Sequence, residues 1–201
     1  MKAQAAPRIR SSTATKGRIL EAAATEFAHY GIHGARVDRI ASNAGANKQL
    51  IYAYFGGKKA LFAEVVVQRL VARNGALGFN ANDIPTFLGK LFDHFVDDDT
   101  DVRLLSWEGL NFAGGAIDAA ALRRKEYRRA IAAIEEAQRR GVISGDLKAT
   151  HLIFALYSMV GWWFAVPQVV TLILGGDPAS KKVLAGYRSA AMEIAARILR
   201  P

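Results

Sequence analysis

The chain has 201 residues, 51% of them hydrophobic, which is enough to bury the core of one large domain or two small ones. It contains no cysteine, so disulfides and thiolate metal sites are excluded, as suits a reducing cytoplasm. The formal net charge is +9, and residues 1–60 hold ten Lys and Arg but only three acids. This concentration of charge favours a binding site for a polyanion over a uniformly basic surface. The first residues lack the apolar stretch of a secretory signal, so a cytoplasmic protein is expected.

Residues 1–14 combine small polar residues and basic side chains with Pro7, and they are predicted to form a flexible basic arm. Arg8 and Arg10 lie in this arm and would reach a DNA groove or phosphate from it, although a solvated arm explains them equally well. From about Thr15, apolar residues recur at helical spacing and predict a first helix that ends near Gly31.

Residues 31–61 have the pattern of two short helices around a glycine turn, which predicts a helix-turn-helix. In the first of these helices, about 37–44, apolar residues follow the spacing i, i+3, i+4, i+7. Gly45 is expected to supply the left-handed backbone that ends it, and Asn47 is expected to cap the second helix, about 48–55. The second helix of such a pair fits the major groove of DNA.

The fold class predicted for the whole chain is all-α, because no segment alternates as a strand. A three-helix DNA-binding domain, 15–61, is expected to continue through a helix at about 58–74 into a larger helical domain, 75–201. The Gly- and Asn-rich segment 74–85 marks the boundary. About nine helices are expected, the later ones at about 84–96, 102–114, 117–140, 148–166 and 178–199, with Asp177 and Pro178 as the cap and first turn of the last.

The stretch from Leu152 to Leu174 carries no charge and has two interpretations. By length alone it would span a bilayer, as in a membrane-attached sensor. Pro167 and Gln168 interrupt it, however, and a helix that is apolar all round can also be buried between its own core and a partner subunit. The buried helix is favoured, and no membrane partner is predicted.

Three motifs flank and include the helix-turn-helix: Ile-Leu-x-Ala-Ala-x-x-x-Phe at Ile19–Phe27, Val-x-x-Ile-Ala-x-x-Ala-Gly at Val37–Gly45 and Ile-Tyr-x-Tyr-Phe-x-x-Lys-x-x-Leu at Ile51–Leu61. Together they resemble the N-terminal domain of the TetR family of transcriptional regulators. The resemblance implies a homodimer that reads a palindromic operator in double-stranded DNA. It also implies a C-terminal domain that binds a small-molecule effector and dimerises through its last two helices, about 148–166 and 178–199.

Lys48, Gln49 and Tyr52 lie near one face of the predicted second helix of the motif. Lys48 can donate to guanine O6 and N7, and Gln49 can pair with adenine N6 and N7. The resemblance places Tyr52 at a position that contacts the DNA backbone or a base. Arg36, Asn47, Tyr54 and Lys58 complete the predicted DNA-binding set, and Lys58 begins a helix whose free N–H groups would help to hold a phosphate.

Four side chains, Trp107, Asn111, Tyr127 and Phe154, lie on helices that surround the effector cavity in the family. They are candidates for a pocket that takes an apolar or aromatic molecule. No catalytic site, metal site or cofactor is predicted, because even the metal-like spacing of His29 and His33 lacks a third ligand. The sequence therefore predicts a DNA-binding repressor released by a small molecule rather than an enzyme. The alternative is a ligand-independent nucleic-acid-binding or architectural protein.

Overall fold

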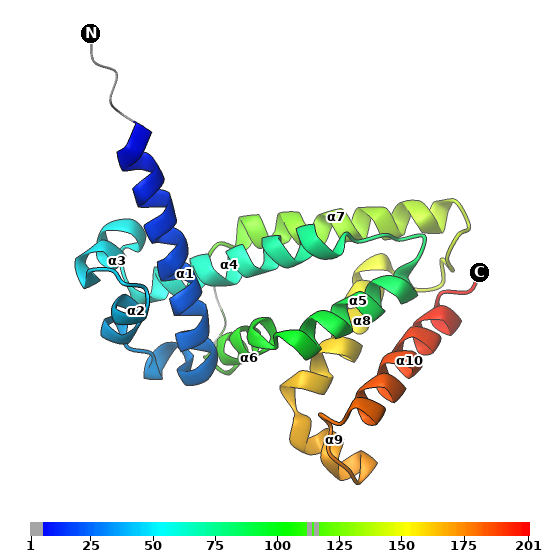
Figure 1. Ribbon diagram of the computed structural model, residues 1–201. Coiled ribbons are helices and arrows are strands. Elements are labelled where there is room, and N and C mark those ends of the chain that lie inside the picture. Colours follow the sequence, from blue (N-terminus) through cyan, green and yellow to red (C-terminus); the bar gives the residue numbers. More distant parts are fainter. Residues whose placement is uncertain (1–5, 112–113, 115–116) are drawn as a thin grey trace. The chain divides into compact units, whose positions relative to one another are not determined.

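The computed structural model describes residues 6–111, 114 and 117–201, and within these ranges it contains ten α-helices and no strand (Figure 1). The predicted all-α fold class is therefore confirmed. The helices are α1 (Ala6–Gly34), α2 (Val37–Asn43), α3 (Lys48–Phe55), α4 (Lys58–Leu77), α5 (Ile84–Asp97), α6 (Thr100–Asn111), α7 (Ala120–Arg139), α8 (Ala149–Ala165), α9 (Pro167–Leu174) and α10 (Lys181–Ile198).

The chain divides into two compact units. The first unit comprises residues 1–69 and 103–120, and the second comprises residues 70–102 and 121–201. Two of the divisions fall within α4 and α6, so each of these helices contributes residues to both units. The sequence prediction has a single division between the DNA-binding and the larger helical domain, at residues 74–85.

The first unit buries apolar side chains from α1, α2, α3 and α4 in one core. Phe27, Ile40, Ile51 and Leu61 are its large members, and none of the four is exposed to solvent. Leu104 of α6 is buried in the same core. The helix-turn-helix is therefore held by a helix that lies far along the chain as well as by its neighbours in sequence.

α1 is longer than predicted and is kinked near its end. It begins at Ala6, within the segment predicted as a flexible arm; residues 1–5 and the side chains of Arg8 and Arg10 lie outside what the structure describes. The kink is at Gly31, whose φ of 64° and ψ of 178° form a backbone conformation that is essentially restricted to glycine. One further turn, to Gly34, leads into α2.

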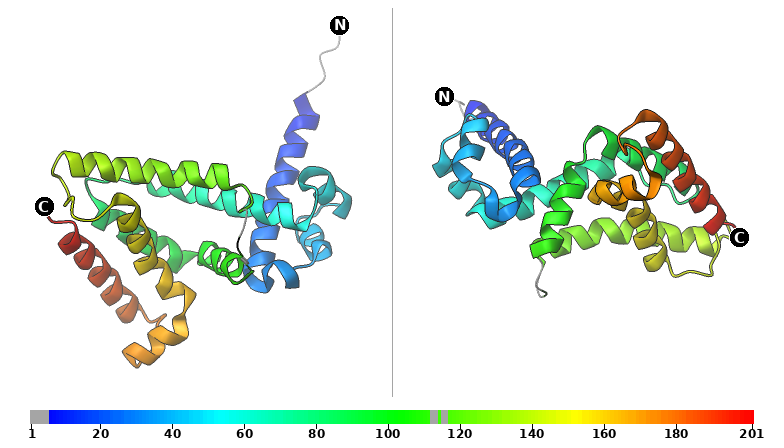
Figure 2. Two further views of the ribbon diagram at one scale, coloured as in Figure 1. Left: turned by 180° about the vertical axis from the view of Figure 1, so that it is seen from behind. Right: turned by 90° about the horizontal axis from the view of Figure 1, so that it is seen from below.

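In the second unit, α5 packs against both α8 and α10 (Figure 2). The buried ring of Phe92 lies 6.1 Å from the ring of Trp163 on α8 and 5.9 Å from that of Tyr187 on α10. α10 comes close to α5 at Gly89, where an added Cβ would lie 2.9 Å from Nη2 of Arg188. A side chain at this position would therefore displace the ends of the Arg188 and Met192 side chains, which lie over Gly89.

The uncharged stretch 152–174 is divided between α8 and α9, which are bent by 88° relative to each other. Pro167 begins α9, because proline fits the first turn of a helix but breaks one that it interrupts. Among the residues that the structure describes, no single helix is long and apolar enough to cross a membrane, and α8 and α9 meet that condition only as the bent pair.

The predicted start of the last helix is wrong by three residues. Ser180 caps α10, with its hydroxyl accepting from the Val183 amide. The carboxylate of Asp177 accepts from the Ala179 amide two residues later, so it closes a turn before the helix instead of capping it.

Candidate nucleic-acid interface

The segment between α2 and α3 forms the tight turn that the sequence predicts. Gly45 has a φ of 57°, and the amides of Gly45 and Ala46 donate to carbonyls near the end of α2. These two bonds form a Schellman motif, which satisfies carbonyls that the end of a helix leaves free. Asn47 then caps α3, with its side-chain oxygen accepting from the Gln49 amide at 2.9 Å. Both the glycine turn and the asparagine cap are confirmed.

α3 divides its side chains between the core and the solvent. Ile51 and Phe55 are buried and fix the helix on the first unit. Lys48, Gln49 and Tyr52 are exposed, Tyr52 to 49%. The structure therefore brings three of the predicted DNA-binding residues together on the exposed side of one short helix. Side chains presented in this way can reach base edges in a major groove.

Lys48 forms an ion pair with Asp38 of α2. Its Nζ lies 2.8 Å from Oδ1 and 3.1 Å from Oδ2 of Asp38. The hydrogen bond to Asp38 raises the pKa of Lys48. The ammonium is thus charged at neutral pH, and at the start of α3 it lies beside a carboxylate of the neighbouring helix.

Lys58 and Tyr54 make contacts inside the first unit. The Nζ atom of Lys58 donates to the carbonyls of His33 and Ala35, at 3.2 and 3.1 Å, and so closes the link between α1 and α2. An ammonium has three N–H donors, which leaves one for a phosphate. The hydroxyl of Tyr54 lies 3.2 Å from that of Ser12 and connects α3 to α1.

A buried carboxylate that the sequence reasoning missed holds α2 against α1. Glu26 is 4% exposed, and its carboxylate accepts from the Arg36 amide at 2.7 Å and from Nε and Nη2 of Arg39 at 2.9 and 2.6 Å. Arg36 is the N-cap residue of α2 and supplies no capping side chain, while its own amide is satisfied by Glu26. The Arg36 side chain itself stays exposed. The Arg39 guanidinium also covers the ring of Tyr30, 4.1 Å from its centroid.

Glu26 is ionised at neutral pH despite its burial. Burial acts to raise the pKa of Glu26, but hydrogen bonds from Arg39 and the Arg36 amide, with the charges of both arginines, outweigh it and leave the pKa below its ordinary value. The sequence contains a signal for this residue. Glu26 lies three residues after Ala23 and seven after Ile19, on the apolar stripe of α1. An acid on such a stripe requires a buried partner.

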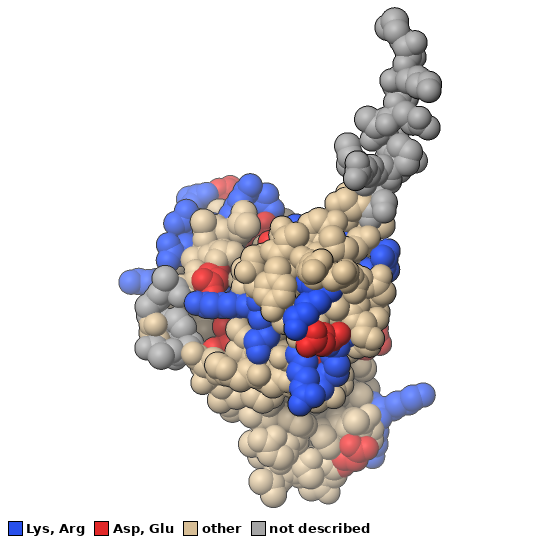
Figure 3. Space-filling model, turned by 90° about the vertical axis from the view of Figure 1, so that its left-hand side faces the viewer, with Lys and Arg blue, Asp and Glu red and all other residues tan. Residues whose placement is uncertain are grey.

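The surface around α2 and α3 carries an excess of positive charge. Between residues 36 and 59 the sequence has five Lys and Arg and one acid, Asp38. Figure 3 shows one face of the protein, where Lys and Arg side chains are spread over an otherwise mostly uncharged surface. Such a surface attracts a polyanion and steers it toward the protein.

Comparison with known proteins identifies the kind of molecule that carries this arrangement. The model of "Bacterial regulatory proteins, tetR family" matches residues 19–65, and that of "Tetracyclin repressor-like, C-terminal domain" matches residues 83–197. The chain belongs to the tetR family. It is 40% identical over 190 residues to the HTH-type transcriptional repressor SCO4008 of Streptomyces coelicolor, a match that covers 94% of this chain and 97% of that protein.

Two further similarities extend over most of this tetR-family chain. The HTH-type transcriptional repressor NicS of Pseudomonas putida is 26% identical over 209 residues, which cover 96% of each protein. The crystal structure of the putative transcriptional regulator SCO4942 from Streptomyces coelicolor superposes with a TM-score of 0.78 and 30% identity, covering 93% of this chain and 99% of that one. The chain is thus a DNA-binding transcriptional regulator and not an enzyme, as the sequence predicts.

The four predicted effector-binding residues of this tetR-family regulator are divided between the two units. Trp107 and Asn111 belong to the first unit. The indole N–H of Trp107 donates to the Ala28 carbonyl at 3.1 Å, and Asn111 donates to the Trp107 carbonyl at 2.7 Å. Tyr127 and Phe154 belong to the second unit, where Phe154 is 75% exposed.

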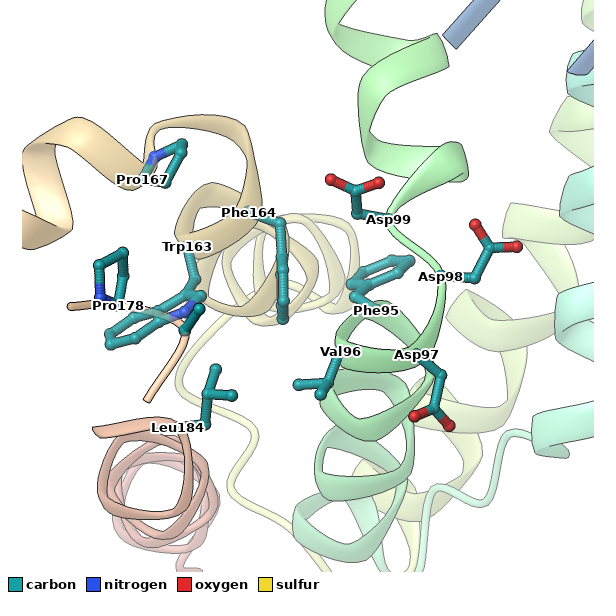
Figure 4. Close-up of a pocket in the computed structure, with 11 residues that line it drawn as sticks. Phe95, Val96, Asp97, Asp98, Asp99, Trp163, Phe164, Pro167, Pro178 and Leu184 are labelled. Atoms are coloured by element: carbon teal, nitrogen blue, oxygen red, sulfur yellow. The ribbon is translucent and has the colours of Figure 1, made fainter. Parts of the chain in front are cut away.

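Two hollows in the second unit have other linings. One, of about 350 Å³, lies among α5, α8 and α10; Figure 4 shows the rings of Phe95, Trp163 and Phe164 around it. The other, of about 330 Å³, is lined by residues of α4, α7 and α8, including Asn74 and Tyr157. Both volumes fall at the lower end of the range of small-molecule sites. Sequence reasoning missed these linings because they depend on how distant helices pack.

Proposed function

We propose that this tetR-family regulator is a repressor that binds a palindromic operator as a homodimer and leaves it when a small molecule binds. The observation that carries the proposal is α3, which is capped, anchored in the core on one side and exposed at Lys48, Gln49 and Tyr52 on the other. Both near-full-length relatives described above are named transcriptional repressors. Since bacterial DNA lies in the cytoplasm, the proposal places the protein there.

In this proposal, base reading and backbone binding are divided between different side chains. Lys48 donates to guanine and Gln49 pairs with adenine, while Tyr52 contacts a base or the backbone. Arg36 and the remaining donor of Lys58 bind phosphates on either side of the groove. The first group supplies sequence preference, and the second supplies affinity that every sequence shares. Two subunits read half-sites about 34–36 Å apart, which is one turn of the double helix.

The homodimer is proposed to form through α8 and α10. Phe154 and Trp162 of α8 are 75% and 63% exposed, and Ile194 and Ile198 of α10 are 43% and 45% exposed. The two helices contact each other within the second unit. Large apolar side chains gathered on neighbouring helices are typical of a protein interface, and a two-fold dimer buries the same patch on both subunits.

Release by a small molecule is supported by the hollows of the second unit and by the position of α6. Residues 100–102 of α6 belong to the second unit and the rest of the helix to the first. Within the first unit, Nε of Arg103 and Nε1 of Trp107 both donate to the Ala28 carbonyl, at 3.0 and 3.1 Å. An effector that shifts the beginning of α6 would therefore act on α1, and through α1 on the helix-turn-helix.

Selection of bound duplexes from a random DNA pool by the purified full-length chain tests this function. The proposal predicts a palindromic consensus whose half-sites are centred about one helical turn apart. The selected duplex then serves as the probe in a screen of apolar and aromatic molecules for loss of binding. A pool without any consensus would contradict the proposal and favour an architectural nucleic-acid-binding protein. A consensus that no molecule displaces would leave a ligand-independent regulator.

A further inference from the structure

Asp38 is an unexpected residue on the surface proposed to face DNA. It is the only acid in the sequence between residues 36 and 59, the segment that contains α2, α3 and the start of α4. It lies in the first turn of α2, where the helix dipole favours a carboxylate, and its side chain is 74% exposed. DNA phosphates nevertheless repel a carboxylate in this position. The charge of Asp38 therefore weakens DNA binding, and its contact with Lys48 is the feature that can give it a role in recognition.

We propose that Asp38 determines specificity: it holds the Lys48 ammonium for base reading and disfavours binding through phosphates alone. This inference deepens the function proposed above, because it requires that Lys48 reads bases. The two carboxylate oxygens lie 2.8 and 3.1 Å from Nζ, although the Lys48 side chain is 46% exposed and has a flexible four-carbon stem. The ion pair is thus what restrains the ammonium at the start of α3.

The restraint affects matched and unmatched DNA differently. An ammonium has three N–H donors, so Lys48 can keep its contact with Asp38 and still donate to O6 and N7 of a guanine. A Lys48 without that restraint can turn to the nearest phosphate, which every sequence offers and which carries no sequence information. The repulsion between Asp38 and phosphates is likewise the same for all DNA sequences. Only a site with the guanine offsets this repulsion, through the hydrogen bonds from Lys48 to the guanine.

The test is Asp38→Asn, which keeps the shape of the side chain and removes its charge. Binding is measured over a series of salt concentrations, with the duplex that the wild-type chain selects and with the same duplex in scrambled order. We expect Asp38→Asn to bind the scrambled duplex more tightly than the wild type does. A plot of the logarithm of the association constant against the logarithm of the salt concentration should also become steeper by about 0.9, which is the change for one added phosphate contact. The ratio of affinities for the two duplexes should fall by about fivefold or more, the lower limit for one base-reading side chain.

Glu64→Gln is the matched control. Glu64 of α4 belongs to the same unit and also forms an exposed ion pair, with its carboxylate 3.3 Å from Nζ of Lys16, and its replacement by glutamine changes the net charge by the same amount. This variant should strengthen binding to both duplexes alike and leave their affinity ratio within about twofold of the wild type. In a Lys48→Ala background, Asp38→Asn should no longer lower the ratio, because the restrained side chain is absent.

The outcomes separate this inference from the function on which it rests. If the wild-type chain selects no consensus, the proposed function fails and the inference fails with it. If a consensus is selected but Asp38→Asn behaves like Glu64→Gln, the inference alone is overturned and Asp38 is only an exposed partner of Lys48. An affinity ratio that rises in Asp38→Asn would also overturn it. Circular dichroism confirms beforehand that each variant is folded.

Discussion

Glu26→Gln would test whether one buried carboxylate holds the DNA-binding helices in place. The substitution preserves the size of the side chain but removes the charge that three N–H donors share. Removing one partner of a buried ion pair costs about 3–5 kcal/mol. The Arg39 side chain is 39% exposed, so water can hydrate the guanidinium that is set free. We therefore expect a smaller loss, of about 2–3 kcal/mol, in the stability of α2 and α3 against local opening.

Native-state hydrogen exchange measures this loss where it should occur. Amides of α2 and α3 in Glu26→Gln should exchange about 30- to 150-fold faster than in the wild type, which is the expected free energy expressed as an opening equilibrium. Glu64→Gln again serves as the control, because an exposed ion pair contributes little and its loss should accelerate exchange less than about fivefold. Equal exchange in the two variants would refute the role of Glu26 as a clamp.

The clamp also predicts how stability depends on pH. Because the pKa of Glu26 lies below its ordinary value in the folded protein, its contribution is present above the ordinary value of 4.5 and is lost as the pH falls through the lower, folded value. The difference in exchange between wild type and Glu26→Gln should therefore be constant at neutral pH and shrink under acidic conditions. A difference that grows on acidification would contradict the assigned direction of the pKa shift.

Three further substitutions test other parts of the structure. Asn47→Ala removes the cap of α3 and should destabilise that helix by about 1 kcal/mol, measured by the same exchange experiment; unchanged exchange would mean that the cap is dispensable. Gly31→Ala places a side chain at a positive φ with its Cβ 2.8 Å from the Trp107 ring, and should lower the free energy of unfolding in urea by about 2–4 kcal/mol. A variant as stable as the wild type would show that the kink does not require glycine. Phe154→Glu places a charge in the proposed dimer interface and should yield monomers in sedimentation velocity; an intact dimer would place the interface elsewhere.

The parts of the site that could be predicted from the sequence depend on signals within a few residues. Gly45 ends α2 because the turn needs a positive φ, and Asn47 caps α3 because its side chain reaches an amide two residues later. Helical periodicity likewise predicts α2 and α3 within one residue of their observed bounds. Local backbone chemistry determines these features, so no knowledge of the packing is needed.

The features that could not be predicted depend on contacts between distant segments. The sequence predicts that Lys58 begins a helix, but not that it donates to carbonyls 25 and 23 residues earlier in the chain. Trp107 donates to the Ala28 carbonyl across 79 residues, a contact within the first unit that side-chain type alone does not indicate. Side-chain type and periodicity indicate that such residues are buried or polar, but they do not identify the partner.

The most direct test of the central claim, that α3 reads base pairs, repeats the DNA selection with Gln49→Ala. Gln68→Ala is the matched control, since Gln68 is an exposed glutamine on α4 of the same unit. We predict that Gln49→Ala selects the wild-type palindrome with the preference lost at one base pair in each half-site, while Gln68→Ala selects the wild-type palindrome unchanged. A consensus that Gln49→Ala leaves unchanged would contradict the assignment of Gln49 as a base reader on α3.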